Sequence, residues 1–354
     1  MKVCQALVQI GDDVRLWLPD SAPTIELDKL AADYGLQSHI PIVRLSSHPL
    51  LRRYDFSIRA VFDARRWRPD LYYVWPYQAA ALASMLGLPT LLELHDRPQG
   101  VMGPLLFRAF LMGSGSRRLL HTTEALRGWI EVAYRTSIRS SFAVLAPNGV
   151  ELQRYQDLPG PAEARRQLGL KEGFTAGYTG HLYKGRGLGM LNELALRNPE
   201  ISFLWVGGEA SAVEKWQARI DAAGADNVRL MGFVSNDRLP MYQAASDVLL
   251  MPHQRRVAAS SGGDIARFAS PMKAFEYLAA GRAILTSDLP VIREILNEGN
   301  SILLPPEDVA AWNEALRSIA RDENRRAELG KQARLDSMKY SWIERARRAT
   351  EGLG

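Results

Sequence analysis

Short apolar segments alternate with helical patterns along the whole chain, and this alternation limits the folds open to it. In the first half the segments VRLWLP, YYVW, TLLEL, RLLHTT and AVLAP read as strands. In the second half FTAGYTG, ISFLWVGG, VRLMGF, DVLLMP, AILTS and SILL do so, with helical patterns such as Ala212–Ala223 and Asp308–Arg321 between them. This order is typical of βαβ units, in which helices cover both faces of a parallel sheet.

A chain of 354 residues is long enough for two such domains. The strongest boundary signal is the segment Pro147-Asn148-Gly149-Val150, because Asn-Gly favours a turn. A loose stretch follows from Leu158, and the second domain opens with the strand at Phe174.

The amino terminus departs from the usual start of an α/β domain, which is a strand followed by a glycine-bearing loop. Residues 1–10 show a helical stripe formed by Val3, Ala6, Leu7 and Ile10, and Gly11 is expected to end that helix. We therefore expect the first strand of the N-terminal domain to be missing. The alternative is a shortened but complete domain.

Composition excludes several classes of protein. The single cysteine, Cys4, rules out an internal disulfide framework and fits a reducing, cytoplasmic setting. No Cys/His cluster has the spacing of a zinc site, and the first residues do not read as a signal peptide. The uncharged run 71–92 is long enough for a membrane span, but Pro76 and Pro89 divide it into a strand, a helix and a strand.

Charge favours an anionic partner for the first half of the chain. The net charge is +5, and residues 1–150 hold 17 Lys and Arg against 13 Asp and Glu. The excess lies in residues 44–68 and 97–139, which suit an anionic membrane surface or a phosphorylated substrate. An ordinary solvated arginine-rich face is the alternative. Nucleic acid is not expected, because no binding motif accompanies the charge.

The most informative motif is Ser270-Pro-Met-Lys-Ala-Phe-Glu-Tyr-Leu-Ala-Ala-Gly281. Ser270 is predicted to cap a helix whose first residue is Pro271, so that free amides and the positive end of the dipole face an anion. Lys273 in the first turn would assist a phosphate, and Glu276 would accept hydrogen bonds from ribose hydroxyls. The alternative is a capped helix with a surface ion pair between Lys273 and Glu276.

A second motif, Gly177-Tyr-Thr-Gly-His-Leu-Tyr-Lys-Gly-Arg-Gly187, joins a strand that ends at Gly180 to a helix. Ligands of open parallel sheets bind at the carboxyl ends of strands, so Lys184 is placed to neutralise a pyrophosphate. A dinucleotide site is the competing interpretation, but Met190 stands where that fingerprint needs a small residue.

A third motif, Leu92-Glu-Leu-His-Asp96, ends a strand of the first domain. His95 is placed to reach a sugar hydroxyl. The alternative is a histidine that holds its own loop by hydrogen bonds.

These residues together resemble the retaining, family 4 type of glycosyltransferase. The resemblance covers residues 174–304 almost continuously, through GYTGHLYKG, FLWVGGE, VRLMGFVSNDRLPMYQAASDVLLMP and SPMKAFEYLAAGRAILTSDLPVIREIL. It is weaker in the first half, through LELHD and APNGVEL, and YSWIERARRATEGL resembles the final helix that returns to the first domain.

The resemblance implies a GT-B fold. Two Rossmann-like domains would face each other with their parallel sheets across a cleft that holds the active site. The acceptor-side domain would comprise residues 1–149 with 341–354, and the donor-binding domain residues 150–340.

The resemblance also assigns roles to single residues. Lys184 matches a phosphate-binding lysine, His95 a histidine that contacts the donor sugar, and Glu276 the second Glu of a Glu-x7-Glu motif, which binds ribose. The first Glu of that motif falls on Phe268, and His181 stands where many members have Arg. The full set expected at the donor comprises Gly180, His181, Phe233, Val234, Ser270, Pro271, Met272, Lys273 and Glu276, with His95 and Lys184 as catalytic groups.

The activity implied is transfer of a hexose from a nucleoside diphosphate sugar to an acceptor hydroxyl with retention of configuration. No cofactor or metal is expected, since the sequence has no Asp-x-Asp. The acceptor would be a polysaccharide or lipid-linked, and residues 103–120, which mix large apolar residues with Arg108, Arg117 and Arg118, would bind an anionic membrane from the cytoplasmic side. The alternative for this segment is a helix packed on the sheet of the first domain. Alternatives are a non-catalytic partner subunit, a sugar-nucleotide epimerase and a phosphorylase.

Overall fold

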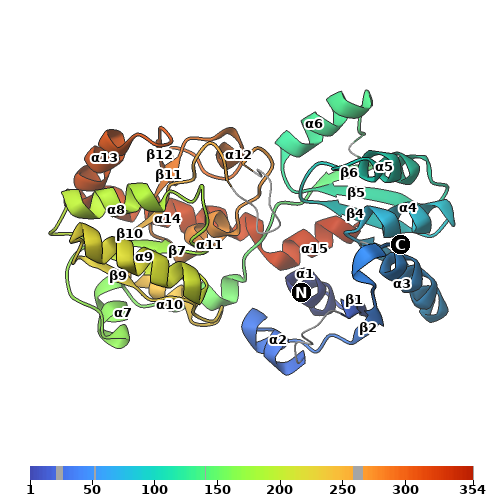
Figure 1. Ribbon diagram of the computed structural model, residues 1–354, viewed down its shortest axis with the longest axis horizontal. Helices are drawn as coiled ribbons and strands as arrows, with labels where there is room; N and C mark the ends of the chain where they lie inside the picture. Colours follow the sequence, from blue (N-terminus) through green and yellow to red (C-terminus); the bar gives the residue numbers. More distant parts are fainter. Residues whose placement is uncertain (21–26, 52, 140, 258–265, 354) are drawn as a thin grey trace. The chain divides into compact units, whose positions relative to one another are not determined.

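All strand pairs of the described residues are parallel, as the alternation of strand and helix patterns predicts. The computed structural model describes residues 1–353 except 21–26, 52, 140 and 258–265. The chain forms two units, of which unit 1 comprises Met1–Pro147 with Trp342–Gly354 and unit 2 comprises Asn148–Ser341. Figure 1 shows the elements of each unit.

Unit 1 contains two separate parallel sheets. Strands β1 (Leu16–Asp20) and β2 (Ile42–Ser46) pair with each other, whereas the second sheet has the order β3-β4-β5-β6. Its strands are β3 (Tyr72–Val74), β4 (Thr90–Leu94), β5 (Arg117–His121) and β6 (Ala143–Leu145). The helices of the unit are α1 (Lys2–Gln9), α2 (Leu27–Tyr34), α3 (Tyr54–Trp67), α4 (Tyr77–Met85), α5 (Met102–Met112), α6 (Glu124–Tyr134) and α15 (Trp342–Thr350).

Unit 2 contains one sheet of six strands in the order β12-β11-β10-β7-β8-β9. Its strands are β7 (Thr175–Thr179), β8 (Ser202–Val206), β9 (Val228–Leu230), β10 (Val248–Met251), β11 (Ala283–Ser287) and β12 (Ile302–Leu304). The helices are α7 (Pro161–Leu168), α8 (Leu188–Arg197), α9 (Ala210–Ala223), α10 (Leu239–Ala244), α11 (Met272–Ala280), α12 (Pro290–Arg293), α13 (Val309–Arg321) and α14 (Glu323–Ser337).

Two layers of apolar side chains enclose the sheet of unit 2. On one face α8, α9 and α13 pack on residues such as Tyr178 and Trp205. On the other face α11, α12 and α14 pack on residues such as Leu249 and Ile284. Burial on both faces explains why β8 and β10 read as nearly continuous apolar runs and why β7 and β11 contain only small, apolar or hydrogen-bonding uncharged residues.

Most elements of unit 1 agree with the sequence prediction. The N-terminal helix is present as α1, and the uncharged run 71–92 forms β3, α4 and β4 as expected. Strand β2 was missed, because its side chains are half-exposed or exposed and Arg44 interrupts the apolar pattern.

Candidate anion-binding site

The strand order of unit 2 creates a switch point between β7 and β10. The chain passes from β7 to β8 and β9 on one side, and β10 then pairs with the other side of β7. The loops that leave these two strands therefore diverge, and ligands of open parallel sheets bind in the crevice formed there. Both motifs singled out in the second half of the sequence lie at this end of the sheet.

Two glycines shape the loop after β7. Gly180 has a φ of +128°, and a Cβ atom at this position would lie 2.8 Å from Cε and 2.9 Å from Nζ of Lys273. Gly187 has a φ of +76°, and a Cβ there would lie 2.0 Å from the carbonyl oxygen of Pro252. The positive φ favours glycine at both positions. At Gly187 the backbone carbonyl of Pro252 also excludes a Cβ, whereas at Gly180 the neighbour is the flexible end of Lys273.

The side chain of Lys273 is buried near the carboxyl ends of β7 and β10, and its ammonium group has no hydrogen-bond partner among the described residues. The Nζ lies 3.8 Å from the centre of the Tyr178 ring. Burial, then the positive charge of Arg186, lower the pKa of Lys273 well below its usual value, against the opposing effect of Glu276. The alternative of a surface ion pair between Lys273 and Glu276 is therefore wrong.

Arg186 and His253 add two further basic groups, and sequence reasoning did not assign either to the site. A guanidinium nitrogen of Arg186 donates a 2.8 Å hydrogen bond to Nε2 of His253, so this imidazole is neutral. Burial and the charges of Lys273 and Arg186 lower the pKa of His253 well below its usual value. Burial also lowers the pKa of Arg186, whose Nε atom has no partner among the described residues. Three basic side chains thus lie close together in a partly buried region, an arrangement that favours the binding of an anion.

Glu276 lies one helical turn after Lys273 on α11 and is half-buried. Burial raises its pKa, while Lys273, a hydrogen bond from Gln243 and the charge of Arg154 act in the opposite direction. Gln243 also donates to Oγ1 of Thr179 at the end of β7, at 3.1 Å, and accepts from the Tyr155 hydroxyl at 2.9 Å. This network holds Glu276 next to the crevice.

The predicted capping of α11 by Ser270 is wrong. The N-cap residue is Pro271, which makes no side-chain capping bond, and the helix begins at Met272. The Ser270 hydroxyl instead accepts a 3.0 Å hydrogen bond from the backbone amide of Asn148, whose side-chain amide donates to the Ser270 carbonyl at 2.7 Å. The Ser270 hydroxyl oxygen is hydrogen-bonded to Asn148 and accepts no bond from the first backbone amides of α11.

The other residues expected at the donor lie around the same end of the sheet. Lys184 is exposed in the loop after β7, and His181 stacks on Tyr183 with ring centres 4.7 Å apart. Phe233 is 71% exposed and Val234 is half-buried, both after β9. Met272 is exposed on the first turn of α11. Phe268 is buried, so an apolar ring occupies the position of the first Glu of the Glu-x7-Glu motif.

His95 lies in unit 1, where it follows β4. Its Nε2 atom is 2.6 Å from Oε1 of the buried Glu93. Burial opposes ionisation of Glu93, but Arg345, His95 and Tyr73 together lower its pKa to about 2. An ionised carboxylate therefore fixes the orientation of His95 while leaving 48% of its side chain exposed.

The arginines chosen for membrane contact serve another role in unit 1. Arg117 donates to the backbone carbonyls of Phe110 and Leu111 at the end of α5. Arg118 is buried and donates to the carbonyl of Ala349 at 2.9 Å. Arg118 is therefore not available to a lipid surface, while membrane binding by this segment stays a prediction. No helix within the described ranges is both long and apolar enough to cross a membrane.

The parallel sheets, their helical layers and the switch point define a GT-B glycosyltransferase fold. HepE of Anabaena, solved in complex with UDP and glucose, matches with a TM-score of 0.76 over 99% of this chain and 94% of that chain, at 18% identity. Residues 174–322 match the family described as "Glycosyl transferases group 1". The phosphatidyl-myo-inositol mannosyltransferase of Mycolicibacterium smegmatis is 30% identical over 97% of this chain and 85% of its own length. The chain therefore belongs to the group 1 glycosyltransferases.

Coverage differs among the relatives. The glycosyltransferase TuaH of Bacillus subtilis, named for teichuronic acid biosynthesis, is 31% identical over 40% of this chain. The match spans 34% of the length of TuaH, so its similarity concerns a part of that protein.

Proposed function

We propose that this protein transfers a hexose from a nucleoside diphosphate sugar to an acceptor hydroxyl, with retention of configuration, as a transferase of the family 4 type. The observation that carries the proposal is the buried, unpartnered ammonium of Lys273 beside Arg186 and His253. A cation in that position is costly in the free protein and is stabilised when a pyrophosphate enters.

In the proposed reaction the acceptor oxygen bonds to the anomeric carbon of the donor while the bond from that carbon to the β-phosphate oxygen breaks. Lys273, Arg186 and the amino end of α11 stabilise the negative charge that develops on the leaving nucleoside diphosphate. The acceptor proton passes to the departing phosphate on the same face of the sugar, which retains configuration. These groups supply the positive charge themselves, so the proposal needs no metal and no cofactor.

The remaining predicted residues have subsidiary roles in the proposal. Glu276 accepts hydrogen bonds from the ribose, and the backbone at Phe233 and Val234 contacts the base. Gly180 gives the pyrophosphate access to Lys273, while Lys184 adds charge from the loop after β7. Burial and the charges of Arg186 and Lys273 lower the pKa of His181, so this residue offers a hydrogen bond from a neutral imidazole. His95 is the group assigned to the transferred sugar.

The proposed acceptor is a lipid-linked or polysaccharide hydroxyl at the cytoplasmic face of a membrane. Two relatives have a lipid in their names, a phosphatidyl-myo-inositol mannosyltransferase and an alpha-galactosylglucosyldiacylglycerol synthase. In this chain α5 exposes Met102, Leu105 and Met112, and these apolar side chains rather than Arg117 and Arg118 are the candidates for lipid contact.

The test is a binding panel of UDP, GDP, ADP and their sugar conjugates, measured by thermal shift and calorimetry. UDP is the first ligand to examine, because HepE binds it. Wild type is compared with Lys273→Met, Glu276→Ala and Lys171→Met, the last replacing an exposed lysine of the same unit. We expect one nucleotide to bind wild type and Lys171→Met, and to bind the other two variants much more weakly.

Turnover separates the transferase from a binding-only relative. Release of nucleoside diphosphate from the donor that binds, dependent on an added acceptor extract, supports a transferase. Binding without any release supports the non-catalytic partner, for which Phe268 in place of a carboxylate is the motivating observation. Failure of every nucleotide to bind at millimolar concentration overturns the donor site itself.

A further inference from the structure

Glu93 is a buried carboxylate in the middle of an apolar strand. It lies on β4 between Leu92 and Leu94, and all three side chains are buried. Burying a charge is costly unless partners pair with it, and a buried ion pair adds little stability compared with apolar residues of similar volume. The sheet of unit 1 therefore does not need a carboxylate at this position, and the role of Glu93 has to be sought in what it contacts.

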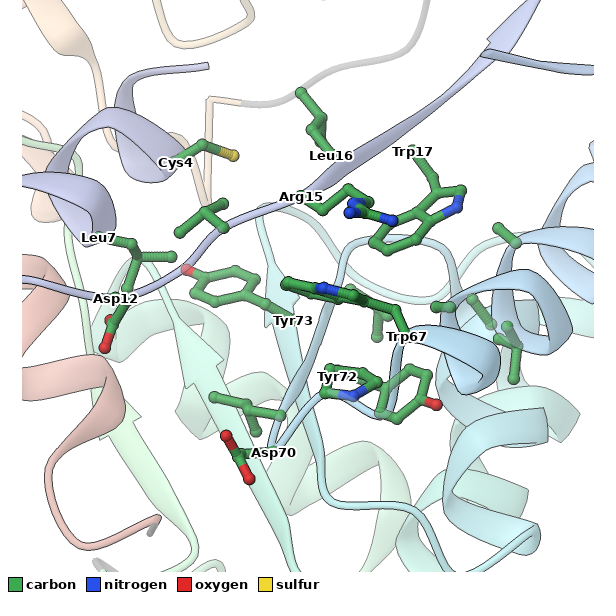
Figure 2. Close-up of a pocket in the computed structure, with 18 of the residues that line it drawn as sticks. Cys4, Leu7, Asp12, Arg15, Leu16, Trp17, Trp67, Asp70, Tyr72 and Tyr73 are labelled. Atoms are coloured by element: carbon green, nitrogen blue, oxygen red, sulfur yellow. The ribbon is translucent and has the colours of Figure 1, made fainter. Parts of the chain in front are cut away.

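Three side chains of unit 1 surround the carboxylate. Arg345 of α15 donates to Oε1 of Glu93 at 2.7 Å, and the hydroxyl of Tyr73, whose ring lines a pocket of unit 1 (Figure 2), donates to Oε2. Arg345 is buried and is held by hydrogen bonds to the carbonyl of Pro147 at 2.9 Å and to the Tyr73 hydroxyl at 3.2 Å. The third partner is His95, whose Nε2 atom lies 2.6 Å from the same Oε1 atom.

This arrangement determines which ring nitrogen of His95 carries the proton. An ionised carboxylate only accepts hydrogen bonds, and a guanidinium only donates them, so the Oε1 atom that Arg345 contacts is an acceptor towards His95 as well. A neutral imidazole has one N–H and one nitrogen with a free lone pair. The hydrogen is therefore on Nε2, and Nδ1 keeps the lone pair. The buried partners of Glu93, rather than the loop of His95, decide this tautomer.

Nδ1 is consequently the polar ring atom of His95 that is left for a ligand. The side chain is 48% exposed, and the residue directly follows β4 at the carboxyl end of a parallel sheet, where ligands of such sheets bind. A ligand that meets neutral His95 there meets an acceptor of hydrogen bonds. A sugar hydroxyl suits this atom because it can donate, whereas an ionised phosphate oxygen has no hydrogen to donate.

We propose that Glu93 and Arg345 are positioning residues, which hold His95 as the Nε2–H tautomer so that its Nδ1 accepts a hydrogen bond from a hydroxyl of the transferred sugar. The contact with that sugar rests on the proposed function, whereas the tautomer is a property of the free protein. The arrangement places a requirement on the donor. Its sugar must carry a hydroxyl at the position that His95 contacts, and a group that cannot donate a hydrogen bond does not replace it.

The tautomer is measured first, by nitrogen-15 NMR of the full chain labelled on its histidines. His95→Ala identifies the His95 signals among those of the six histidines. At a pH where the ring is neutral, the wild type should show a protonated Nε2 and an unprotonated Nδ1. A proton on Nδ1, or an even mixture of the two forms, would overturn the proposal. No donor is needed for this measurement.

Variants then separate the two positioning residues from their surroundings. Glu93→Leu combined with Arg345→Met removes the buried charge together with its counter-charge, and His95 should then show both tautomers. Glu93→Gln should keep the wild-type tautomer, because Arg345 still requires an acceptor oxygen at the position shared with His95. Glu124→Gln replaces a carboxylate of unit 1 that pairs with Arg127 nearer the surface, and it should also keep the wild-type tautomer. A double variant that retains the single tautomer would contradict the role of Glu93 and Arg345.

Turnover tests the contact with the sugar. In the donor that turns over, single hydroxyls are replaced in turn by hydrogen and by fluorine, neither of which can donate a hydrogen bond. At one position both replacements should lower kcat/KM about tenfold in wild type and have no effect in His95→Ala. If fluorine replaces that hydroxyl without loss, or if no position depends on His95, the contact is refuted. If no donor turns over, the contact falls with the proposed function, whereas the tautomer in the free protein is decided by NMR alone.

Discussion

Replacing Lys273 with methionine is expected to change stability and ligand binding in opposite directions. In the free protein the Lys273 ammonium is buried without a hydrogen-bond partner. An unsatisfied buried polar group costs about 1–3 kcal/mol, and methionine fills a similar space without a polar atom. The free variant should therefore be more stable than wild type by about that amount, which corresponds to a rise in Tm of about 2–10 °C for a domain of this size.

Nucleotide binding should respond in the reverse sense. Removing one partner of a buried, hydrogen-bonded charge pair costs about 2–5 kcal/mol, so the dissociation constant for the nucleoside diphosphate should rise by about 30-fold to 5,000-fold. Calorimetry on wild type, Lys273→Met and Lys171→Met measures this directly. A variant that is less stable without ligand, or that binds the nucleotide as tightly as wild type, would refute the reasoning.

The pH dependence gives an independent check on the same residue. The lowered pKa of Lys273 means that the unfolded chain holds more protons on this group than the folded one. This lysine therefore destabilises the free protein increasingly as pH falls from about 10.5 towards the lowered folded pKa. A bound pyrophosphate restores the charge, so nucleotide binding should take up a proton. Calorimetry in buffers of different ionisation enthalpy measures that uptake, which should disappear in Lys273→Met.

Two further predictions concern other residues. Gly180→Ala should weaken nucleotide binding at least tenfold, about 1.4 kcal/mol, because the new Cβ stands at a positive φ and displaces the end of Lys273. The control, Gly189→Ala on α8, places its Cβ in open space and should bind the nucleotide as wild type does. Equal affinities of the two variants in calorimetry would contradict this prediction. Glu93, whose pKa falls to about 2 from 4.5, should contribute about 3 kcal/mol above pH 4.5 that is lost as pH drops towards 2. Denaturant unfolding of Glu93→Gln should therefore give a lower free energy of unfolding at pH 7 and a smaller loss of that free energy below pH 4.5. An unchanged loss at acid pH would show that Glu93 is not the titrating group.

The sequence predicts the central strands of unit 2 well because β7, β8, β10 and β11 are largely buried on both faces. It also identifies Lys273 and Glu276, which share a motif of one helix. Arg186 lies within the second motif, but no pattern within the sequence connects it with His253. That pairing follows from β10 lying next to β7, and strand order is set by tertiary packing rather than by local spacing.

The sequence predictions for Ser270, Arg117 and Arg118 differ from the structure for a similar reason. Ser270 has the composition and position of a helix cap, but Asn148, 122 residues earlier in the chain, engages its hydroxyl. Arg117 and Arg118 have the charge expected of a lipid-binding surface, but carbonyls at the ends of α5 and α15 accept their hydrogen bonds. In each case a distant partner decides the role of a side chain whose local context favours another.

Lys273 also has a consequence for chemical labelling. Burial and the charge of Arg186 lower the pKa of Lys273, so this amine is deprotonated over a wider pH range than an ordinary lysine, and a deprotonated lysine is a nucleophile. Lys339, by contrast, is held charged by Asp336. A nucleotide that carries an aldehyde should therefore form an imine at Lys273 in preference to the exposed lysines. Reduction of the imine would give a stable secondary amine and so identify the residue that the donor contacts.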